Sequence, residues 1–232
     1  MQSDFRPDAL LAEVVGTFAL VFAATGSIMV NDLSGGVVTH IGVAAAPGLV
    51  VAAMIYAVGD ISAAHFNPAV TIGFWSVGRL PGRLVAPYIG SQVAGAVLAS
   101  FALWLLLPED RGLMGAHVPA IPAAPSVAME VILTFFLMFV ILGVIGFLNA
   151  APGAERINRQ PSSGLAVGAV VALAIWFAGP TSGASMNPAR SLAPALFAVE
   201  PLQYLWIYLV GPVGGALLAG LTGRLIRHTS RS

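Results

Sequence analysis

The stretch Ser185-Met-Asn-Pro-Ala-Arg190 decides the fold, because a close copy of it occurs earlier in the chain, at His65-Phe-Asn-Pro-Ala-Val70. Asn-Pro occurs at these two places only, and Ala follows both times. Proline is favoured in the first turn of a helix, where its missing N–H would have no helical partner, and Asn is a favoured N-cap. Each Asn-Pro-Ala therefore predicts the start of a helix.

The helix predicted after each copy is short. The run from Pro68 to Val77 has about ten residues, which is roughly 15 Å of α-helix. The run from Pro188 to Val199 is similar. A hydrocarbon core is about 30 Å thick, so each run would cross half of it. We expect the capped ends of both helices to lie near the middle of a membrane.

The composition is that of an integral membrane protein. The chain has 232 residues, of which 58% are hydrophobic and 9% charged, with a mean hydropathy of +0.90. A soluble domain has about 25% charged residues. The chain has no cysteine, which excludes disulfides, thiol catalysis and a thiolate metal site, and its zero net charge gives no argument for nucleic acid. The first apolar stretch, Ala9 to Val30, is too long for the core of a signal peptide, so it is expected to stay as a spanning helix.

Six apolar stretches have lengths that fit a transmembrane helix. They lie at roughly 9–30, 41–59, 84–107, 126–148, 163–179 and 203–226. The first Asn-Pro-Ala lies in 60–83, between the second and third stretches, and the second lies in 180–202, between the fifth and sixth. The Pro-rich segment 108–125 is predicted to be a loop that connects two halves.

The two halves repeat one another. Residues 13–22 match residues 130–139 at six of ten positions, including the glutamate that opens each stretch. Each half has three spans, an odd number, so the second half must insert upside down relative to the first. We therefore predict one domain, 1–232, made of inverted repeats at approximately 1–107 and 126–232. The inversion would bring the two half-spanning helices together at their N-termini.

The arginines orient this bundle. All but Arg111 and Arg190 fall on one side of a six-helix arrangement, and excess basic charge marks the cytoplasmic side, so both termini are predicted to be cytoplasmic. The arginines on that side are Arg6, Arg79, Arg83, Arg156, Arg159, Arg224, Arg227 and Arg231.

Glycines with a small residue four positions later predict close helix packing. They are Gly90, Gly164, Gly211 and Gly215.

These residues resemble the aquaporin superfamily of major intrinsic proteins. The resemblance rests on the two Asn-Pro-Ala copies, the arginine after the second, and a glutamate in the first helix of each half. The stretches 179–194 and 206–212 are most similar to the nodulin-26-like, aquaglyceroporin-type branch and its bacterial relatives. The resemblance implies an all-α hourglass of six transmembrane helices and two re-entrant half-helices. It also implies a pore in every protomer, a homotetramer, and a place in the plasma or inner membrane.

The two asparagines are the first predicted pore residues. Asn67 and Asn187 would each cap a helix and also point an amide donor into the pore, with Pro68, Ala69, Pro188 and Ala189 completing the two motifs. Helix N-termini carry about half a positive charge each. Two facing N-termini would repel cations and orient a passing water so that no continuous proton wire forms.

The resemblance also implies a selectivity filter. Arg190 would be its arginine, and a charge inside an apolar re-entrant segment is a functional hypothesis by default. By spacing from the asparagines, the other three filter residues would be Pro47, Ile175 and Ala184. Water-selective members usually have a bulky aromatic and a His at the first two, so this filter is expected to be apolar and wider. Pro47 departs from the family's usual patterns.

The remaining site residues support or line the pore. The resemblance implies that Glu13 and Glu130 accept N–H bonds from the re-entrant loops, and that His65 lines the cytoplasmic half of the pore. Asp60 is expected to be a solvated acid at the cytoplasmic mouth. The other pore-lining positions, expected to contribute carbonyl acceptors with His65, are Ala63, Ala64, Gly183, Ala184 and Ser185. The histidines interpreted as loop or tail residues are His40, His117 and His228.

We therefore expect a passive channel for small uncharged solutes, with membrane lipid as its surroundings and without a cofactor or metal. The solutes would be glycerol, urea or metalloid acids, together with water, and protons and ions would be excluded. One alternative is a mainly water-selective channel. Another is an ion-coupled transporter with broken helices, in which Glu13 and Glu130 would carry the coupling ion. An enzyme is not expected, because the sequence shows no nucleophile–base pair, phosphate loop or metal cluster.

Overall fold

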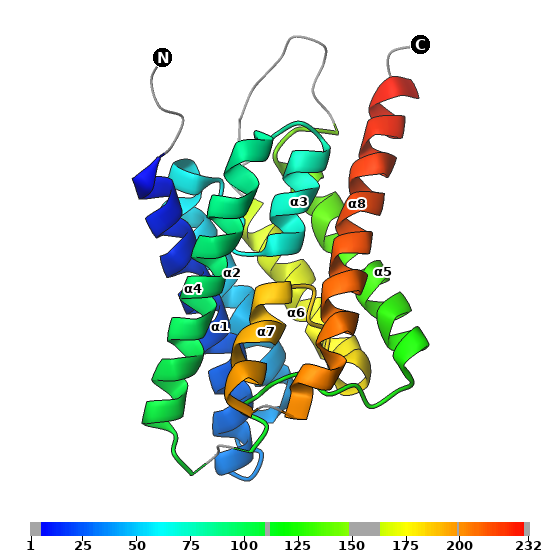
Figure 1. Cartoon of the computed structure of the whole chain (residues 1–232). Coiled ribbons are helices and arrows are strands. Elements are labelled where there is room, and N and C mark those ends of the chain that lie inside the picture. The colour runs from blue at the N-terminus through cyan, green and yellow to red at the C-terminus, as the bar shows by residue number, and fades with distance from the viewer. Residues whose placement is uncertain (1–5, 110–111, 149–162, 199, 230–232) are drawn as a thin grey trace.

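The structure is a computed structural model that describes residues 6–109, 112–148, 163–198 and 200–229, and the described residues form helices and loops (Figure 1). Six helices are long and apolar enough to cross a membrane, which confirms the predicted all-α fold class. They are α1 (Pro7–Leu33), α2 (Thr39–Ser62), α4 (Gly82–Leu106), α5 (Ala123–Val144), α6 (Ser163–Ser182) and α8 (Leu205–Thr229). The short elements are α3 (Pro68–Ser76), α7 (Pro188–Ala198) and the 3₁₀ helix η1 (Glu200–Tyr204).

Four long helices, α1, α2, α6 and α8, end three residues later than the sequence predicts, whereas α5 ends four residues earlier. Both α2 and α6 extend by three residues, to Ser62 and Ser182, into the segments assigned to the re-entrant loops. Their ends are set by backbone conformation, because the next residues have left-handed φ angles, 68° at Ala63 and 93° at Gly183.

The short helices occupy opposite halves of the bundle. The start of α1 and the end of α8 lie at one end, where α3 also lies, and α7 lies in the other half (Figure 1). We call these the α3 end and the α7 end. With 9 and 11 residues, α3 and α7 are about 14 and 17 Å long. Each therefore covers about half of a hydrocarbon core.

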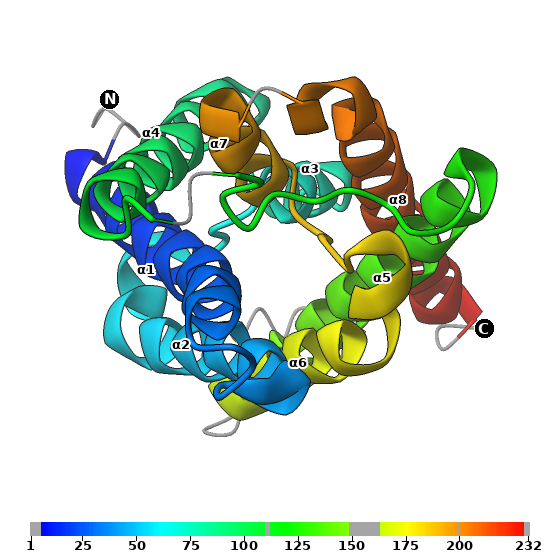
Figure 2. The ribbon, with the colours of Figure 1, turned by 90° about the horizontal axis from the view of Figure 1, so that it is seen from below.

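The two halves of the chain interlock. Helices α1 and α4 pack together, as do their counterparts α5 and α8, while α2 packs against α6 across the bundle. Each short helix contacts the last long helix of the other half, α3 against α8 and α7 against α4. The view along the axis of the bundle shows the long helices as a ring around the loops that lead into α3 and α7 (Figure 2).

Glycine permits the closest helix contacts, as predicted for three of the four positions. A Cβ on Gly215 would lie 2.3 Å from the carbonyl oxygen of Val131, and one on Gly211 2.6 Å from the Cβ of Glu130. A Cβ on Gly164 would lie 2.8 Å from the ring of Tyr56. Within this chain the prediction does not hold for Gly90, where a Cβ would meet nothing within 4 Å, because this residue faces away from the helices around α4.

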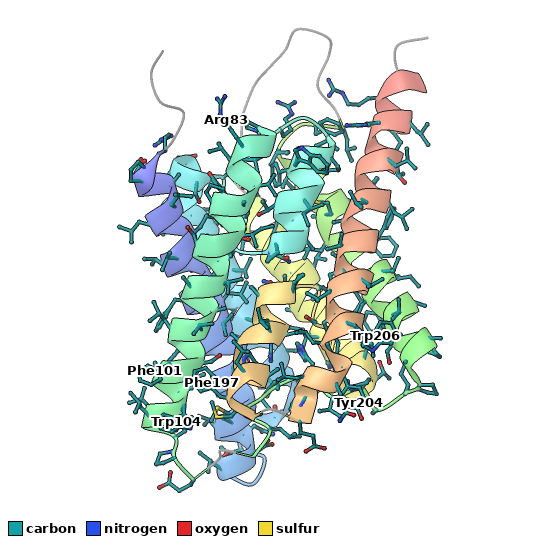
Figure 3. The ribbon with its side chains drawn as sticks, viewed as in Figure 1. Arg83, Phe101, Trp104, Phe197, Tyr204 and Trp206 are labelled. Carbon is teal, nitrogen blue, oxygen red and sulfur yellow. The ribbon has the colours of Figure 1, made fainter. Side chains whose placement is uncertain are left out.

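The outer faces of the long helices are apolar. Large hydrophobic side chains stand exposed on all six, for example Leu11, Leu49, Phe136, Leu165 and Leu221. Such faces suit the hydrocarbon of a membrane, where apolar side chains need no burial within the protein. Five labelled aromatic side chains gather near the α7 end, and Arg83 lies at the α3 end (Figure 3).

Candidate functional site

Both Asn-Pro-Ala copies begin a helix, as predicted. Asn67 has an extended backbone, with φ −159° and ψ 123°, and its Oδ1 accepts the N–H of Ala69 at 2.8 Å. The Oδ1 of Asn187 accepts the N–H of Ala189 at 3.0 Å and that of Arg190 at 3.3 Å. Each asparagine therefore uses its carbonyl oxygen to cap the short helix that follows it.

The asparagine amides also tie the two loops together. The Nδ2 of Asn67 donates to the carbonyl of Met186 at 2.7 Å, and the Nδ2 of Asn187 donates to the carbonyl of Phe66 at 2.9 Å. A side-chain amide carries two N–H groups, so one hydrogen on each asparagine remains. Both asparagines line the same central cavity, into which that hydrogen can be donated.

The loops before the asparagines are strained in the same way in both halves. Ala64 and Phe66 have φ angles of 52° and 51°, and their counterparts Ala184 and Met186 have 49° and 54°. A left-handed conformation costs a non-glycine residue about 1–2 kcal/mol. It persists only where the surroundings hold it, so this strain needs fixed partners.

Glu13 supplies those partners in the first half. Its Oε1 accepts the Ser62 hydroxyl at 2.7 Å and the His65 N–H at 2.9 Å, and its Oε2 accepts the Phe66 N–H at 2.7 Å. The Nε2 of Gln92 donates to Oε2 as well, at 2.8 Å. All of these groups are donors, so the shell suits an ionised, acceptor-only carboxylate.

Glu130 does the same in the second half. Its Oε1 accepts the Ser182 hydroxyl and the Ser185 N–H, both at 2.9 Å, and its Oε2 accepts the Met186 N–H at 2.8 Å. A tyrosine closes the end of the long helix before the loop, since Tyr208 Oη donates to the Ser182 carbonyl at 2.7 Å. The matching bond from Tyr88 Oη to the Ser62 carbonyl is 3.1 Å.

The four predicted filter residues line one cavity. Pro47, Ile175, Ala184 and Arg190 contribute to the wall that also contains both asparagines. Arg190 is 5% exposed, and its Nη1 donates to the carbonyl of Gly115 at 2.9 Å, which fixes the guanidinium against the wall. The other three side chains are apolar, so the guanidinium is the charged group among the four.

Pro47 has a second effect on this wall. It lies inside α2, where a proline has no N–H to donate to the residue four positions before it. That residue is Val43, which lines the same cavity. The Val43 carbonyl thus loses its usual helical donor beside the predicted filter residues.

The cavity continues toward both ends of the bundle. It shares His65 with a hollow at the α3 end, which Asp60 and Ala63 also line. It shares Gly183 and Ile175 with a hollow at the α7 end. The other predicted lining residues, Ala64 and Ser185, belong to the cavity wall itself.

His117 lies in a loop, as predicted, but the sequence did not indicate that its side chain is buried in the cavity wall. It comes from the connector between α4 and α5, is 7% exposed, and lines the cavity beside Arg190. Burial, and then the Arg190 cation, lower the pKa of His117 well below its ordinary value, so the ring is neutral near pH 7.

One sequence signal could have located His117. Gly183 is the counterpart of Ala63, and a Cβ on Gly183 would lie 2.7 Å from the Cδ2 of His117. A glycine at a position where the other half has alanine indicates that another group packs closely against the backbone there. His40 lies in the first turn of α2, where its Nε2 bonds the Trp176 carbonyl at 2.6 Å, so the interpretation as a loop residue is wrong. Residue 228 lies within α8, so the interpretation as a tail residue is wrong.

Four predicted cytoplasmic or connecting arginines lie outside the described residues, so the structure does not place them. They are Arg111, Arg156, Arg159 and Arg231.

Comparison with known proteins agrees with this geometry. The profile of the family described as "Major intrinsic protein" matches residues 2–222. Aquaporin NIP1-1 of Oryza sativa subsp. japonica is 44% identical over 222 residues, covering 96% of this chain and 75% of the relative. Aquaporin NIP1-1 of Zea mays is also 44% identical, covering 96% of this chain and 76% of the relative.

A solved structure shares the fold. The X-ray structure of the aquaglyceroporin from Plasmodium falciparum superposes with a TM-score of 0.78 at 23% identity, covering 97% of this chain and 98% of that one. With the profile match and the nodulin-26-like relatives, this shows that the chain belongs to the major intrinsic protein family, the aquaporins, whose members are passive membrane channels.

Proposed function

We propose that this channel passes small uncharged solutes, namely glycerol, urea or metalloid acids such as boric and arsenous acid, together with water, and excludes protons and ions. The observation that carries the proposal is the filter wall, in which one guanidinium faces Pro47, Ile175 and Ala184. None of these three side chains has a bulky aromatic ring. An apolar wall with one fixed donor suits a neutral solute that has both a carbon face and hydroxyl or amide groups.

The exclusion of ions and protons is proposed from the charges along the cavity. Arg190 opposes cations at the filter, and the N-termini of α3 and α7 add positive potential at the centre. Asn67 and Asn187 each keep one N–H for a permeant. A water that accepts from both turns its oxygen toward them, so it cannot pass a proton along the file.

Glu13 and Glu130 argue against the ion-coupled transporter. A coupling carboxylate must reach the permeation path. Neither glutamate belongs to the cavity wall, and each is fully buried with its oxygens taken by loop donors. The site roles proposed for both are therefore structural, holding the two loops in place.

The mainly water-selective channel remains the second candidate. It would be favoured if the Gly115 carbonyl, which positions Arg190, held the guanidinium far enough across the opening to stop larger solutes. Permeability decides between the two candidates.

We also propose the surroundings of the channel. Among the described residues, Arg79, Arg83, Arg224 and Arg227 lie at the α3 end, close to the start of α1 and the end of α8, which supports cytoplasmic termini. The plasma or inner membrane and a homotetramer are proposed on the family resemblance, and the apolar outer faces leave room for both lipid and neighbouring protomers.

Stopped-flow light scattering on proteoliposomes tests the function. Water permeability would be compared with the uptake of glycerol, urea and boric acid on one preparation. Rapid solute entry supports the proposed filter, whereas water flux without solute entry favours the water-selective channel. Saturable uptake driven by a pH gradient would favour the transporter.

Arg190→Ala tests ion exclusion on the same vesicles. Removing the guanidinium should raise proton or cation leak while solute flux persists, because the fixed positive charge at the filter is lost. Unchanged leak in a variant that elutes like the wild type would show that Arg190 is not the residue that excludes ions.

A further inference from the structure

His40 joins α2 to α6 at the α7 end of the bundle. It lies in the first turn of α2, and its Nε2 lies 2.6 Å from the carbonyl oxygen of Trp176 in α6. His40 also lines the hollow at the α7 end, which shares Ile175 and Gly183 with the central cavity. The bond between the two helices therefore lies at the hollow that adjoins the proposed filter.

A proline explains why this carbonyl can accept a side-chain donor. In a regular α-helix the carbonyl of Trp176 would accept the N–H of the residue four positions later, but that residue is Pro180, which has no N–H. The last turns of α6 therefore lack one backbone hydrogen bond. The imidazole of His40 supplies a donor to the same oxygen from a helix of the other half of the chain.

The contact fixes the state of the imidazole. A carbonyl oxygen only accepts, so Nε2 of His40 must carry a hydrogen. The ring also packs on α6, because a Cβ on Gly179 would lie 3.1 Å from the Cε1 of His40. The hydrogen bond and this packing together set the distance between α2 and α6 at the hollow.

We propose that His40 is a positioning residue for the filter, because its Nε2–H replaces the donor that Pro180 lacks and so fixes the part of α6 that carries Ile175. Ile175 directly precedes Trp176, so a change in the backbone at Trp176 shifts the side chain of Ile175. The proposal rests on the proposed function, since the filter is part of it. In this role His40 acts through Ile175 and not on the solute.

The exposure of the bond decides what its loss would do. His40 and Trp176 are both exposed, so water can replace either partner and the folded state should lose little stability. Water cannot replace the fixed distance between α2 and α6, so the opening beside Ile175 would vary in width. A large solute passes only in the widest states, whereas water passes in most of them, so selectivity for size should fall.

Three substitutions separate the hydrogen bond from the bulk of the side chain. His40→Leu removes the donor at a similar size. His40→Gln keeps a donor, because the amide nitrogen of glutamine reaches near the place of Nε2. Pro180→Ala gives the Trp176 carbonyl an N–H partner within α6, so His40→Leu should have little further effect in that background.

The ratio of erythritol to glycerol permeability in proteoliposomes is the transport readout. His40→Leu should raise this ratio about two- to tenfold, the equivalent of one neutral hydrogen bond. The ratio should stay near the wild-type value in His40→Gln, and it should differ little between Pro180→Ala and the double variant. An unchanged ratio in His40→Leu, or the same rise in the Pro180→Ala background, would overturn the proposal.

Nitrogen NMR tests the bond without any solute. The chain has four histidines, so selective ¹⁵N-histidine labelling gives a simple spectrum in which His40→Gln identifies the signals of residue 40. At about pH 8, where an ordinary imidazole is neutral, we expect a hydrogen on Nε2 and none on Nδ1, and the opposite tautomer refutes the proposal.

A separate outcome distinguishes this proposal from the proposed function. If the wild type passes water but not glycerol, the proposed function fails. The ratio of glycerol to water permeability then becomes the readout for His40. His40→Leu should raise that ratio because the opening beside Ile175 still varies in width, and a ratio that stays at the wild-type value refutes the role of His40.

Discussion

Glu130→Gln tests whether one carboxylate holds the second loop in its strained conformation. The side chain is fully buried and accepts from one hydroxyl and two backbone N–H groups. Glutamine keeps one acceptor oxygen and replaces the other by an amide donor. If the remaining oxygen serves Ser182 and Ser185, the new donor faces the N–H of Met186, and that bond is lost.

The size of the effect follows from that single bond. A hydrogen bond to a charged acceptor is worth about 1.5–3 kcal/mol, and a buried donor left facing another donor costs about 1–3 kcal/mol more. Relaxation of Met186 from its φ of 54° would return about 1–2 kcal/mol. These ranges combine to a loss of about 0.5–5 kcal/mol in the free energy of unfolding, and their midpoints to about 3 kcal/mol, so the melting temperature should fall by about 6–12 °C for a chain of this size.

Thr134→Val is the matched control, because Thr134 lies one turn along α5 from Glu130 and is equally buried. Its hydroxyl has no partner among the described residues, so an apolar group of the same shape should be neutral or stabilising. Glu13→Gln should repeat the loss in the first half, where the N–H of Phe66 takes the place of the Met186 N–H.

Melting of the purified variants in one detergent, followed by tryptophan fluorescence, measures these shifts. Water permeability per folded channel should fall in the glutamine variants as well, because Met186 and Phe66 present the carbonyls that bind the asparagine amides. If Glu130→Gln melted within about 2 °C of both the wild type and Thr134→Val, the carboxylate would not be what holds the loop.

Three further predictions rest on single side chains. Gly215→Ala should destabilise the protein by about 1–3 kcal/mol through overpacking, because the new Cβ would lie 2.3 Å from a carbonyl oxygen of α5. Gly90→Ala should be neutral or slightly stabilising, because a Cβ there meets nothing within 4 Å. The melting temperatures of the two variants check both expectations. Mercurials should not inhibit the cysteine-free wild type, while Ala184→Cys should make the channel sensitive to them, and a water-flux assay with and without reducing agent checks this. Because the folded state holds the pKa of His117 below that of the unfolded chain, stability should fall as the pH drops below about 6.5, where only the unfolded state binds the proton. Urea unfolding at several pH values should show a smaller acid slope in His117→Asn, and an unchanged slope would contradict it.

Much of this site could be predicted because its determinants are local. An Asn N-cap followed by Pro at the first helical position needs no knowledge of the rest of the chain, and both predicted starts are present. The glutamates were found from the repeat, which set each at nearly the same distance before its asparagine. The family resemblance, with its spacing from each asparagine, implied Pro47 and Ile175 as filter residues, and both line the cavity.

The features that could not be predicted depend on the course of a loop through space or on which side of a helix is packed. His117 reaches the cavity because of the course of a connector, and a single histidine in a Pro-rich loop gives no periodicity that would place it. Gly90 shows the same limit, because a glycine pattern indicates that a helix can be approached closely but not which side another helix approaches. The ends of α2 and α6 were missed because backbone strain, and not hydropathy, ends them.

The differences between the two halves explain how one scaffold can place the proposed filter in only one half of the cavity. The groups that hydrogen-bond the loops and the helix ends before them are the same in both halves, namely a glutamate, a serine and a tyrosine in each. The groups that face the cavity differ, since Arg190 corresponds to Val70, and Ser185 to His65. Because the supporting carboxylate bonds backbone N–H groups, it accepts either side chain at these places. The side chains that face the cavity can therefore vary while the loop geometry stays fixed, and His117 lies beside a serine and a glycine of the second half.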